Sequence, residues 1–237
     1  MAPTISYCLN QTQRTSSWLK SRSWVATLIA LAAFCNTGIQ AGNTPEPKFV
    51  PVRSEPGLSY ANVRVESEPW SIHILKVDRS RKDIGFFSAH ARDKVLAVSL
   101  IADQARGVPR ELGRALAGIN ADFYVRDTPT YVGDPRGLQI VNGELYSAPD
   151  TVCVWFDTNG NPHLDEVKGE FKITWEDGRT TSFGLNEERK PAGAVLYTPT
   201  LGVSTRTRGG RELILEQDGD GPWLPLHAGQ IYRARVR

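Results

Sequence analysis

The fold is decided by residues Gly137–Phe183, which read GLQIVNGELYSAPDTVCVWFDTNGNPHLDEVKGEFKITWEDGRTTSF. Three turn pairs divide this stretch: Asn142-Gly143, Asn159-Gly160 and Asp177-Gly178. Such pairs between alternating apolar and polar runs are strong hairpin signals, and both turn residues are expected at positive φ. We therefore predict a β-hairpin meander after residue 137. Its expected strands are Gly137–Val141, Glu144–Ser147, Val152–Asp157, His163–Val167, Phe171–Trp175 and Thr180–Phe183.

Outside the meander the pattern predicts more strands and a single helical region. Apolar residues recur every three or four positions in Val98–Ala105 and Pro109–Ala117, so we expect helix over about 95–117. The predicted class is α+β, strand-rich, with a mixed or antiparallel sheet. The further strands are expected at Trp70–Val77, Ile84–Ala89, Ala194–Thr198, Leu213–Gln217 and Ile231–Val236.

Residues 1–41 have the pattern of a signal peptide. Basic residues precede the apolar run Trp24–Cys35, and small and polar residues follow it as far as Ala41. We expect cleavage near Ala41 and a secreted or periplasmic protein that meets the membrane only during export; the alternative is an N-terminal membrane anchor. Residues 42–58 hold four prolines and predict an extended linker or arm, and 59–237 form the expected domain.

Charge and cysteine content narrow the class of protein. The chain has 28 Lys and Arg against 26 Asp and Glu, and three of the basic residues lie in the predicted leader. No nucleic-acid partner is therefore expected, because such proteins carry a clear cationic excess. Cys153 is the only cysteine after the leader and lies in an apolar strand pattern, which predicts a buried structural thiol.

No metal or cofactor is expected from the sequence. Asp157, Asn159 and Asn161 resemble the start of a calcium loop, but Pro162 and Lys168 stand where such a loop needs Gly and Glu. A hairpin turn accounts for the same residues. The four histidines have no ligand spacing, and no zinc pattern is present.

The candidate site is the loop region Gly118–Gly143. We expect Ala117–Ile119 to form a buried strand that ends at Asn120, with Asp122 directly after it. Polar groups at the end of a rigid strand commonly build a site. Asp134 and Arg136 lie further along the same loop. The alternative is that Asn120 and Asp122 only satisfy backbone groups.

Three segments carry a resemblance to a known family: INADFY at Ile119–Tyr124, GLQIVNGEL at Gly137–Leu145, and AVLYTPTLGVSTRT at Ala194–Thr207. Their order and spacing resemble the phosphodiester glycosidases, the N-acetylglucosamine-1-phosphodiester α-N-acetylglucosaminidase-like family, in its bacterial secreted branch. The family's second half, with an Arg-Thr-Ala-x-Gly strand and an Asp-Gly-Gly-Gly-Ser loop, does not occur before Arg237. We therefore expect the chain to hold the N-terminal half of such a domain.

The resemblance implies hydrolysis of a sugar-1-phosphodiester bond, with a glycan or sugar phosphate as substrate. It places Asn120 and Gly137 at family positions. From side-chain chemistry we expect Asn120 and Asp122 to be catalytic, with Asp122 as base or electrostatic stabiliser. Arg136 is expected to hold the phosphate, and Asp134 and Gly137 to line the substrate site.

Two other classes of function remain open at this point. The first is a non-catalytic secreted β-rich module that binds a glycan or envelope polymer through Tyr124, Tyr131 and Trp223. The second is a structural envelope protein without a small ligand. Residues of this kind more often pack in a core, so exposure of the three aromatic side chains is the feature that would favour a binding module.

Overall fold

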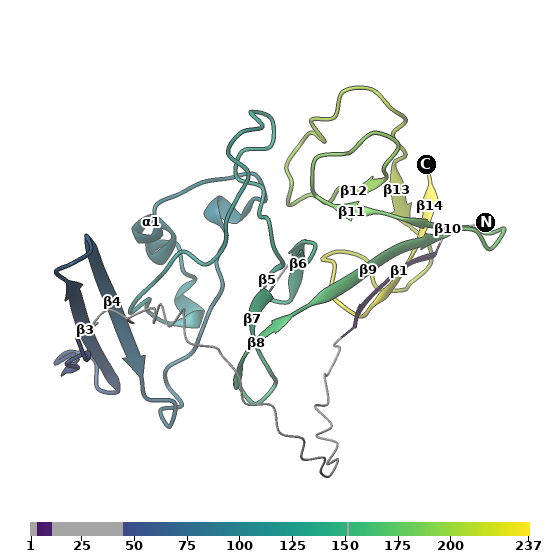
Figure 1. The fold of residues 1–237 in the computed structure, drawn as a ribbon. Helices are drawn as coiled ribbons and strands as arrows, with labels where there is room; N and C mark the ends of the chain where they lie inside the picture. The colour runs from purple at the N-terminus through teal and green to yellow at the C-terminus, as the bar shows by residue number, and fades with distance from the viewer. Residues whose placement is uncertain (1–3, 11–44, 151) are drawn as a thin grey trace, which may run out of the picture. The chain divides into compact units, whose positions relative to one another are not determined.

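Antiparallel strands dominate the computed structural model, which describes residues 4–10, 45–150 and 152–237 (Figure 1). The chain divides into two compact units, residues 14–86 and residues 1–13 with 87–237. The predicted strand-rich α+β class is confirmed. Among the described residues no helix is long and apolar enough to cross a membrane.

The unit of residues 14–86 contains one antiparallel sheet in the order β2-β3-β4. Strand β4, Trp70–Val77, has the predicted bounds, and it pairs along its whole length with β3, Leu58–Val65. The predicted linker 42–58 contributes β2, Val50–Pro51. Alternate residues Ala61, Val63 and Val65 are buried, so β3 presents one face to a core.

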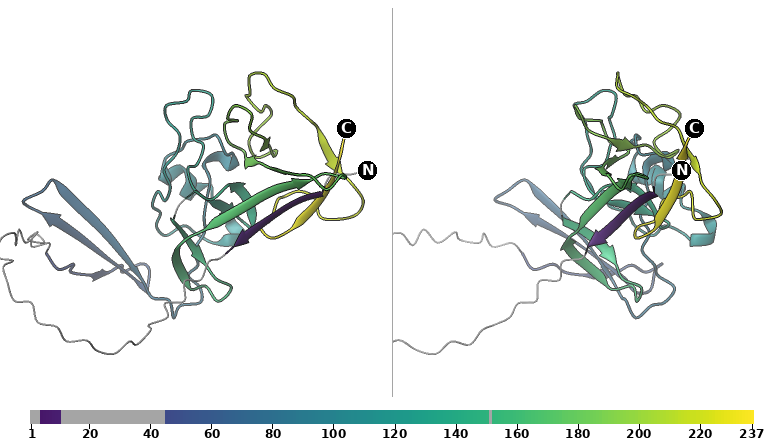
Figure 2. Two further views of the ribbon diagram at one scale, coloured as in Figure 1. Left: turned by 45° about the vertical axis from the view of Figure 1, so that its right-hand side comes forward. Right: turned by 90° about the vertical axis from the view of Figure 1, so that its right-hand side faces the viewer.

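A five-stranded sheet is the largest of the described sheets in the larger unit, with the order β10-β9-β1-β14-β13 (Figures 1 and 2). All four pairings between its neighbouring strands are antiparallel. Its members are β1 (Thr4–Asn10), β9 (Lys168–Thr174), β10 (Thr180–Ser182), β13 (Leu215–Gln217) and β14 (Ile231–Val236). The central strand therefore comes from the segment that the sequence assigns to a leader.

Three small two-stranded sheets complete the strands of this unit. They pair β5 (Gln139–Val141) with β6 (Glu144–Ser147), β7 (Val152–Phe156) with β8 (Pro162–Glu166), and β11 (Gly184–Leu185) with β12 (Val195–Leu196). The last pair is parallel. The predicted strand Ile84–Ala89 does not form.

The three predicted turns all occur, but in two geometries. Asn142 and Gly143 have φ of 50° and 80°, so both residues are left-handed as expected. At Gly160 and Gly178 only the glycine has positive φ, which corrects the prediction for Asn159 and Asp177. The hairpin loops that contain Gly160 and Gly178 are each one residue longer than the loop at Gly143. In each of them, residues with negative φ are followed by a glycine with positive φ, which closes the loop.

The calcium-like segment is a hairpin turn, as predicted. The Asp157 carboxylate accepts hydrogen bonds from the backbone amides of Asn159 and Asn161, each at 2.8 Å. Hydrogen bonds lower the pKa of Asp157, with the Asn161 side chain contributing most. Cys153, in β7, is half-buried where full burial was expected, and burial raises the pKa of its thiol.

The helical region is shorter than predicted. Within it, only α1, Ile101–Arg106, is α-helical. A short 3₁₀ turn at Ala91–Asp93 precedes α1, and another at Arg110–Leu112 follows it. The helix ends at Gly107, and Pro109 disfavours helix in the residue before it. No residue of α1 is buried, so packing does not extend it.

Two hydrophobic clusters form the core of the larger unit. The first contains Leu145, Phe171, Phe183, Leu185, Leu226, Tyr232 and Ala234. The second contains Val95, Val141, Tyr146 and Leu201. Strand β6 contributes Leu145 to the first cluster and Tyr146 to the second, because successive strand residues face opposite sides.

Asn186 joins β6 to the segment that follows β12. Its amide nitrogen donates to the Tyr146 carbonyl and to Thr198 Oγ1, both at 3.0 Å. Its side-chain oxygen accepts the Thr198 amide hydrogen at 2.8 Å. Asn186 is fully buried and has φ of 53°, a conformation that Asn tolerates better than most residues.

We expect Asn186→Ala to lower the free energy of unfolding by about 2–4 kcal/mol, because it leaves buried backbone groups unpaired and puts Ala at positive φ. Chemical denaturation measures this. Asn142→Ala is the matched control, since Asn142 has φ of 50° but is exposed. Equal losses in the two variants would contradict a special role for the buried amide.

Candidate functional site

The predicted site region folds as a closed antiparallel loop over residues 122–137. The Val125 amide donates to the Asp134 carbonyl at 2.8 Å, and the Arg136 amide donates to the Phe123 carbonyl at 2.9 Å. Asp134 and Arg136 lie on the same arm of this loop, where Asp134 is buried and Arg136 is exposed. The loop thus holds two of the predicted site residues in a fixed relation.

Asp122 and Gly137 meet at the base of the loop. Asp122 Oδ2 accepts the Gly137 amide hydrogen at 2.8 Å. A Cβ atom on residue 137 would lie 3.1 Å from the same oxygen, so glycine permits this close approach. Asp122 Oδ1 makes no hydrogen bond with the described residues. One carboxylate oxygen therefore closes the ladder, and the other is available.

The expected buried strand before Asn120 does not form. Residues Ala117–Ile119 are exposed and lie in no strand, and the Ile119 side chain is 86% exposed. An apolar run becomes a buried strand only when another strand pairs with it. None of the described strands pairs with this run. Asn120 is exposed and makes no hydrogen bond within the described part of the chain.

Asp134 is the most unusual ionisable residue of the loop. Its side chain is only 6% exposed, and it makes no hydrogen bond or ion pair with any described residue. Burial raises its pKa from 3.8 to about 7, with smaller contributions from the charges of Glu187 and Glu188. A buried carboxyl group near like charges favours the protonated form.

The two glutamates were missed by the sequence analysis. They directly follow Asn186, whose buried amide fixes the start of their loop. Burial also raises the pKa of Glu187. Adjacent acids in a short loop were the only signal in the sequence, and this signal does not distinguish a solvated loop from a site.

The segment Ala194–Thr207 packs against the site loop. The Tyr131 hydroxyl donates to the Thr205 carbonyl at 2.5 Å and lies 3.4 Å from the Tyr197 hydroxyl. Arg206 Nη1 donates to the Thr130 carbonyl at 2.8 Å. Burial raises the pKa of both tyrosines. One of the three segments that carry the family resemblance therefore lies directly against the candidate site loop.

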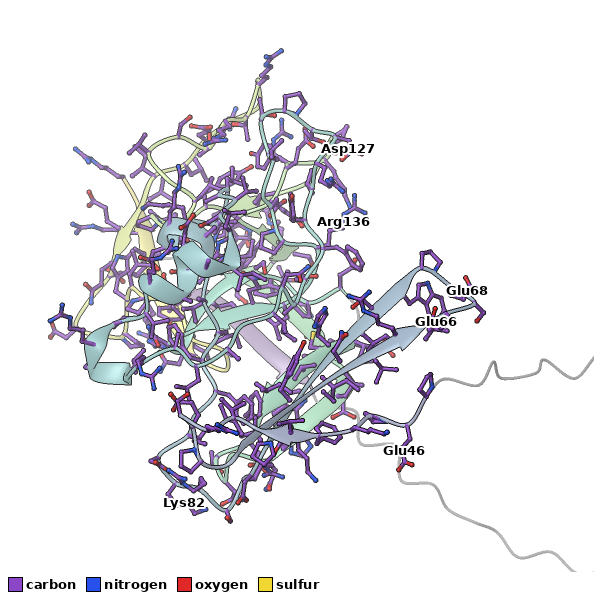
Figure 3. The ribbon with its side chains drawn as sticks, turned by 90° about the vertical axis from the view of Figure 1, so that its left-hand side faces the viewer. Glu46, Glu66, Glu68, Lys82, Asp127 and Arg136 are labelled. Carbon is purple, nitrogen blue, oxygen red and sulfur yellow. The ribbon has the colours of Figure 1, made fainter. Side chains whose placement is uncertain are left out.

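Arg136 lies on the surface of the loop. It is exposed and makes no hydrogen bond or ion pair with the described residues. Figure 3 shows Arg136 on the same side of this unit as Asp127. An exposed guanidinium group without a partner is available to bind an anion in two-point geometry.

Only one of the three aromatic candidates for glycan binding is well exposed. Tyr131 is 2% exposed, and Trp223 packs against the first hydrophobic cluster. Tyr124 is 40% exposed, and the Arg126 guanidinium lies 5.9 Å from its ring centre. Two of the three therefore have packing roles, as expected for residues of this kind.

No family model, curated protein or solved structure matches this chain. Within the described ranges, no group of three or more His, Cys, Asp or Glu side chains is arranged to hold a metal ion.

Asp134→Asn is expected to raise stability at pH 8 and leave it unchanged below pH 4. Because the native pKa of about 7 exceeds the ordinary value of 3.8, the native state binds this proton more tightly. The resulting stability is fully present below pH 3.8 and is lost as the pH rises through about 7. The gain at pH 8 is on the order of 4 kcal/mol, at about 1.4 kcal/mol per pKa unit.

Denaturant titrations at pH 4, 6 and 8 measure this gain. Asp127→Asn is the control, since it removes an exposed carboxylate from the same loop and should change stability by less than about 0.5 kcal/mol at each pH. If stability depended on pH in the same way in both variants, the pKa of Asp134 would not be raised in the folded protein.

Proposed function

We propose that this protein is an exported glycosidase that hydrolyses a sugar-1-phosphodiester bond. The observation that carries the proposal is the buried Asp134, with its pKa raised to about 7, two residues before the exposed Arg136, which has no ion-pair partner among the described residues. Such a pair supplies a proton acceptor tuned to neutral pH and an anion-binding group. The resemblance in Ile119–Tyr124 and Gly137–Leu145 supports the same reaction.

In the proposed reaction, Arg136 holds the phosphodiester and the Asp134 carboxylate removes a proton from water. The water oxygen bonds to the anomeric carbon while the bond from that carbon to the phosphate oxygen breaks. The electron pair leaves with the phosphate monoester. Positive charge develops on the sugar ring in the transition state, and a carboxylate close by stabilises it.

Asn120 and Asp122 keep supporting roles in this proposal. The exposed Asn120 amide binds a sugar hydroxyl or N-acetyl group, and Asp122 Oδ1 faces the developing positive charge. Asp122 also holds the Gly137 amide, so it positions the loop. This assigns the base to Asp134, where the sequence alone favoured Asp122, because Asp134 is the one with the raised pKa.

The proposal includes export. The basic start, the apolar run Trp24–Cys35 and the small residues before Ala41 support a signal peptide. The segments 1–3 and 11–44 lie outside the described residues. Secretion or a periplasmic location follows from this leader, and N-terminal sequencing of the exported protein tests the cleavage near Ala41.

The activity test uses the methyl phosphodiester of N-acetylglucosamine-1-phosphate, with free sugar and methyl phosphate measured together. We expect kcat to rise with pH through about 7, because the base must be deprotonated. Asp134→Asn should lower kcat at least about 100-fold and remove this pH dependence. Asp127→Asn should retain both.

Three further variants separate binding from chemistry. Arg136→Gln should raise KM for the phosphodiester, whereas Asn120→Ala and Asp122→Ala should strongly lower turnover. Asp122→Ala should also lower stability, because it leaves the Gly137 amide without its partner. Rates like those of the unmodified protein in all three would remove these residues from the site.

A glycan-binding module without turnover is the second candidate. The exposed side chains of Phe123 and Tyr124, 82% and 40% exposed, favour it because sugars stack on accessible aromatic rings. Glycan binding that Phe123→Ala abolishes, without release of sugar or phosphate monoester, would establish this function in place of the enzyme.

A further inference from the structure

Strand β1 fills the centre of the five-stranded sheet. It pairs with β9 at seven positions, from Thr4 opposite Thr174 to Asn10 opposite Lys168. It pairs with β14 at three positions on its other edge. Figure 2 shows β1 lying along β9, and the strand order puts β14 beyond it.

Among the described strands, β1 is the one that pairs with both halves of the sheet. Strand β9 pairs with β10, strand β14 pairs with β13, and β9 and β14 do not pair with each other. Without β1, each of these strands presents an open edge, which is a template for another strand. The gap between β9 and β14 is hereafter called the strand slot.

The core of the unit spans the strand slot. Phe171 on β9 and Tyr232 on β14 belong to the same buried cluster. In register, Ile5 lies opposite Ile173 on one side and Tyr232 on the other. An empty slot would therefore open the cluster to water as well as leave backbone groups unpaired.

We propose that residues Thr4–Asn10 are a built-in occupant of the strand slot, and that leader cleavage near Ala41 frees the slot for an extended segment of a partner polypeptide. The inference rests on the predicted cleavage and is independent of the glycosidase activity. The occupant changes from a strand of the same chain to a strand of another.

The neighbours of the slot define the chemistry of the partner segment. The inner positions on either side, Phe171, Ile173 and Tyr232, require apolar residues at every second position, as TISYCLN has at 5, 7 and 9. The outer positions hold Arg233 opposite residue 4, Lys172 opposite residue 6 and Glu170 opposite residue 8, and Lys172 pairs with Glu170, so neutral polar residues suit these positions. The partner segment is therefore a strand of alternating apolar and neutral polar residues, antiparallel to both neighbours.

The first experiment tests occupation in the uncut full chain. Cys8 lies opposite Glu170, and directly opposed residues of antiparallel strands have Cα separations that a disulfide can span. With Cys35 and Cys153 replaced by serine, Glu170→Cys should form a disulfide with Cys8 on mild oxidation. Lys172→Cys, which lies opposite Ser6, should not.

The second experiment tests exchange after cleavage. A site-specific protease sequence is placed at Ala41 in the full-length Glu170→Cys chain, and the cut protein is incubated with a peptide of residues 1–13 in excess. We expect the peptide to bind at one per chain and to cross-link through its Cys8 to the thiol introduced at position 170. A peptide with Ile5→Pro should bind at least about tenfold more weakly, because proline cannot donate within a central strand.

Three results would overturn the proposal. One is equal cross-linking of the Glu170→Cys and Lys172→Cys chains. Another is a cut protein that keeps its stability and takes up no peptide after loss of residues 1–41. The third is equal binding of the unmodified and Ile5→Pro peptides. Measured activity on the phosphodiester plays no part in any of these readouts, so the two proposals fail separately.

Discussion

The buried amide of Asn186 is the interaction on which most of the larger unit depends. It binds the Tyr146 carbonyl in β6 and the Thr198 backbone after β12, so it ties together segments that are 40 and 12 residues away. Leu145 and Tyr146 face the two hydrophobic clusters, which places this amide beside the strand that both clusters share. A fully satisfied buried amide fixes one arrangement, because any other leaves its groups unpaired.

The hydrogen bonds of the Asn186 amide also position the acidic residues near Asp134. The residues after Asn186 are Glu187 and Glu188, and Tyr197 directly precedes Thr198. Holding Asn186 and Thr198 together therefore fixes both segments that face the loop of Asp134. Burial of Asp134 near two like charges disfavours its ionised form. A fold tolerates such a group where the rest of the structure supplies the stability, and functional sites are where these costs concentrate.

The predicted leader and strand β1 place conflicting demands on the N-terminal segment. The predicted leader would be removed near Ala41, whereas β1 completes the five-stranded sheet between β9 and β14. The conflict disappears if different strands occupy the position of β1 in turn. Backbone pairing with β9 and β14 needs only an extended segment in which apolar and polar residues alternate.

The sequence by itself determined part of the local structure. The turns at Gly143, Gly160 and Gly178 and the bounds of β4, β6 and β14 follow from left-handed glycines and short-range alternation. Tertiary structure decided the rest. Ala117–Ile119 has the composition of a buried strand yet is exposed, because strand formation depends on a pairing partner that local sequence does not specify. The pKa of Asp134 depends on burial and on the charges of a loop distant in the sequence, and such a long-range approach leaves no periodic signal in the sequence.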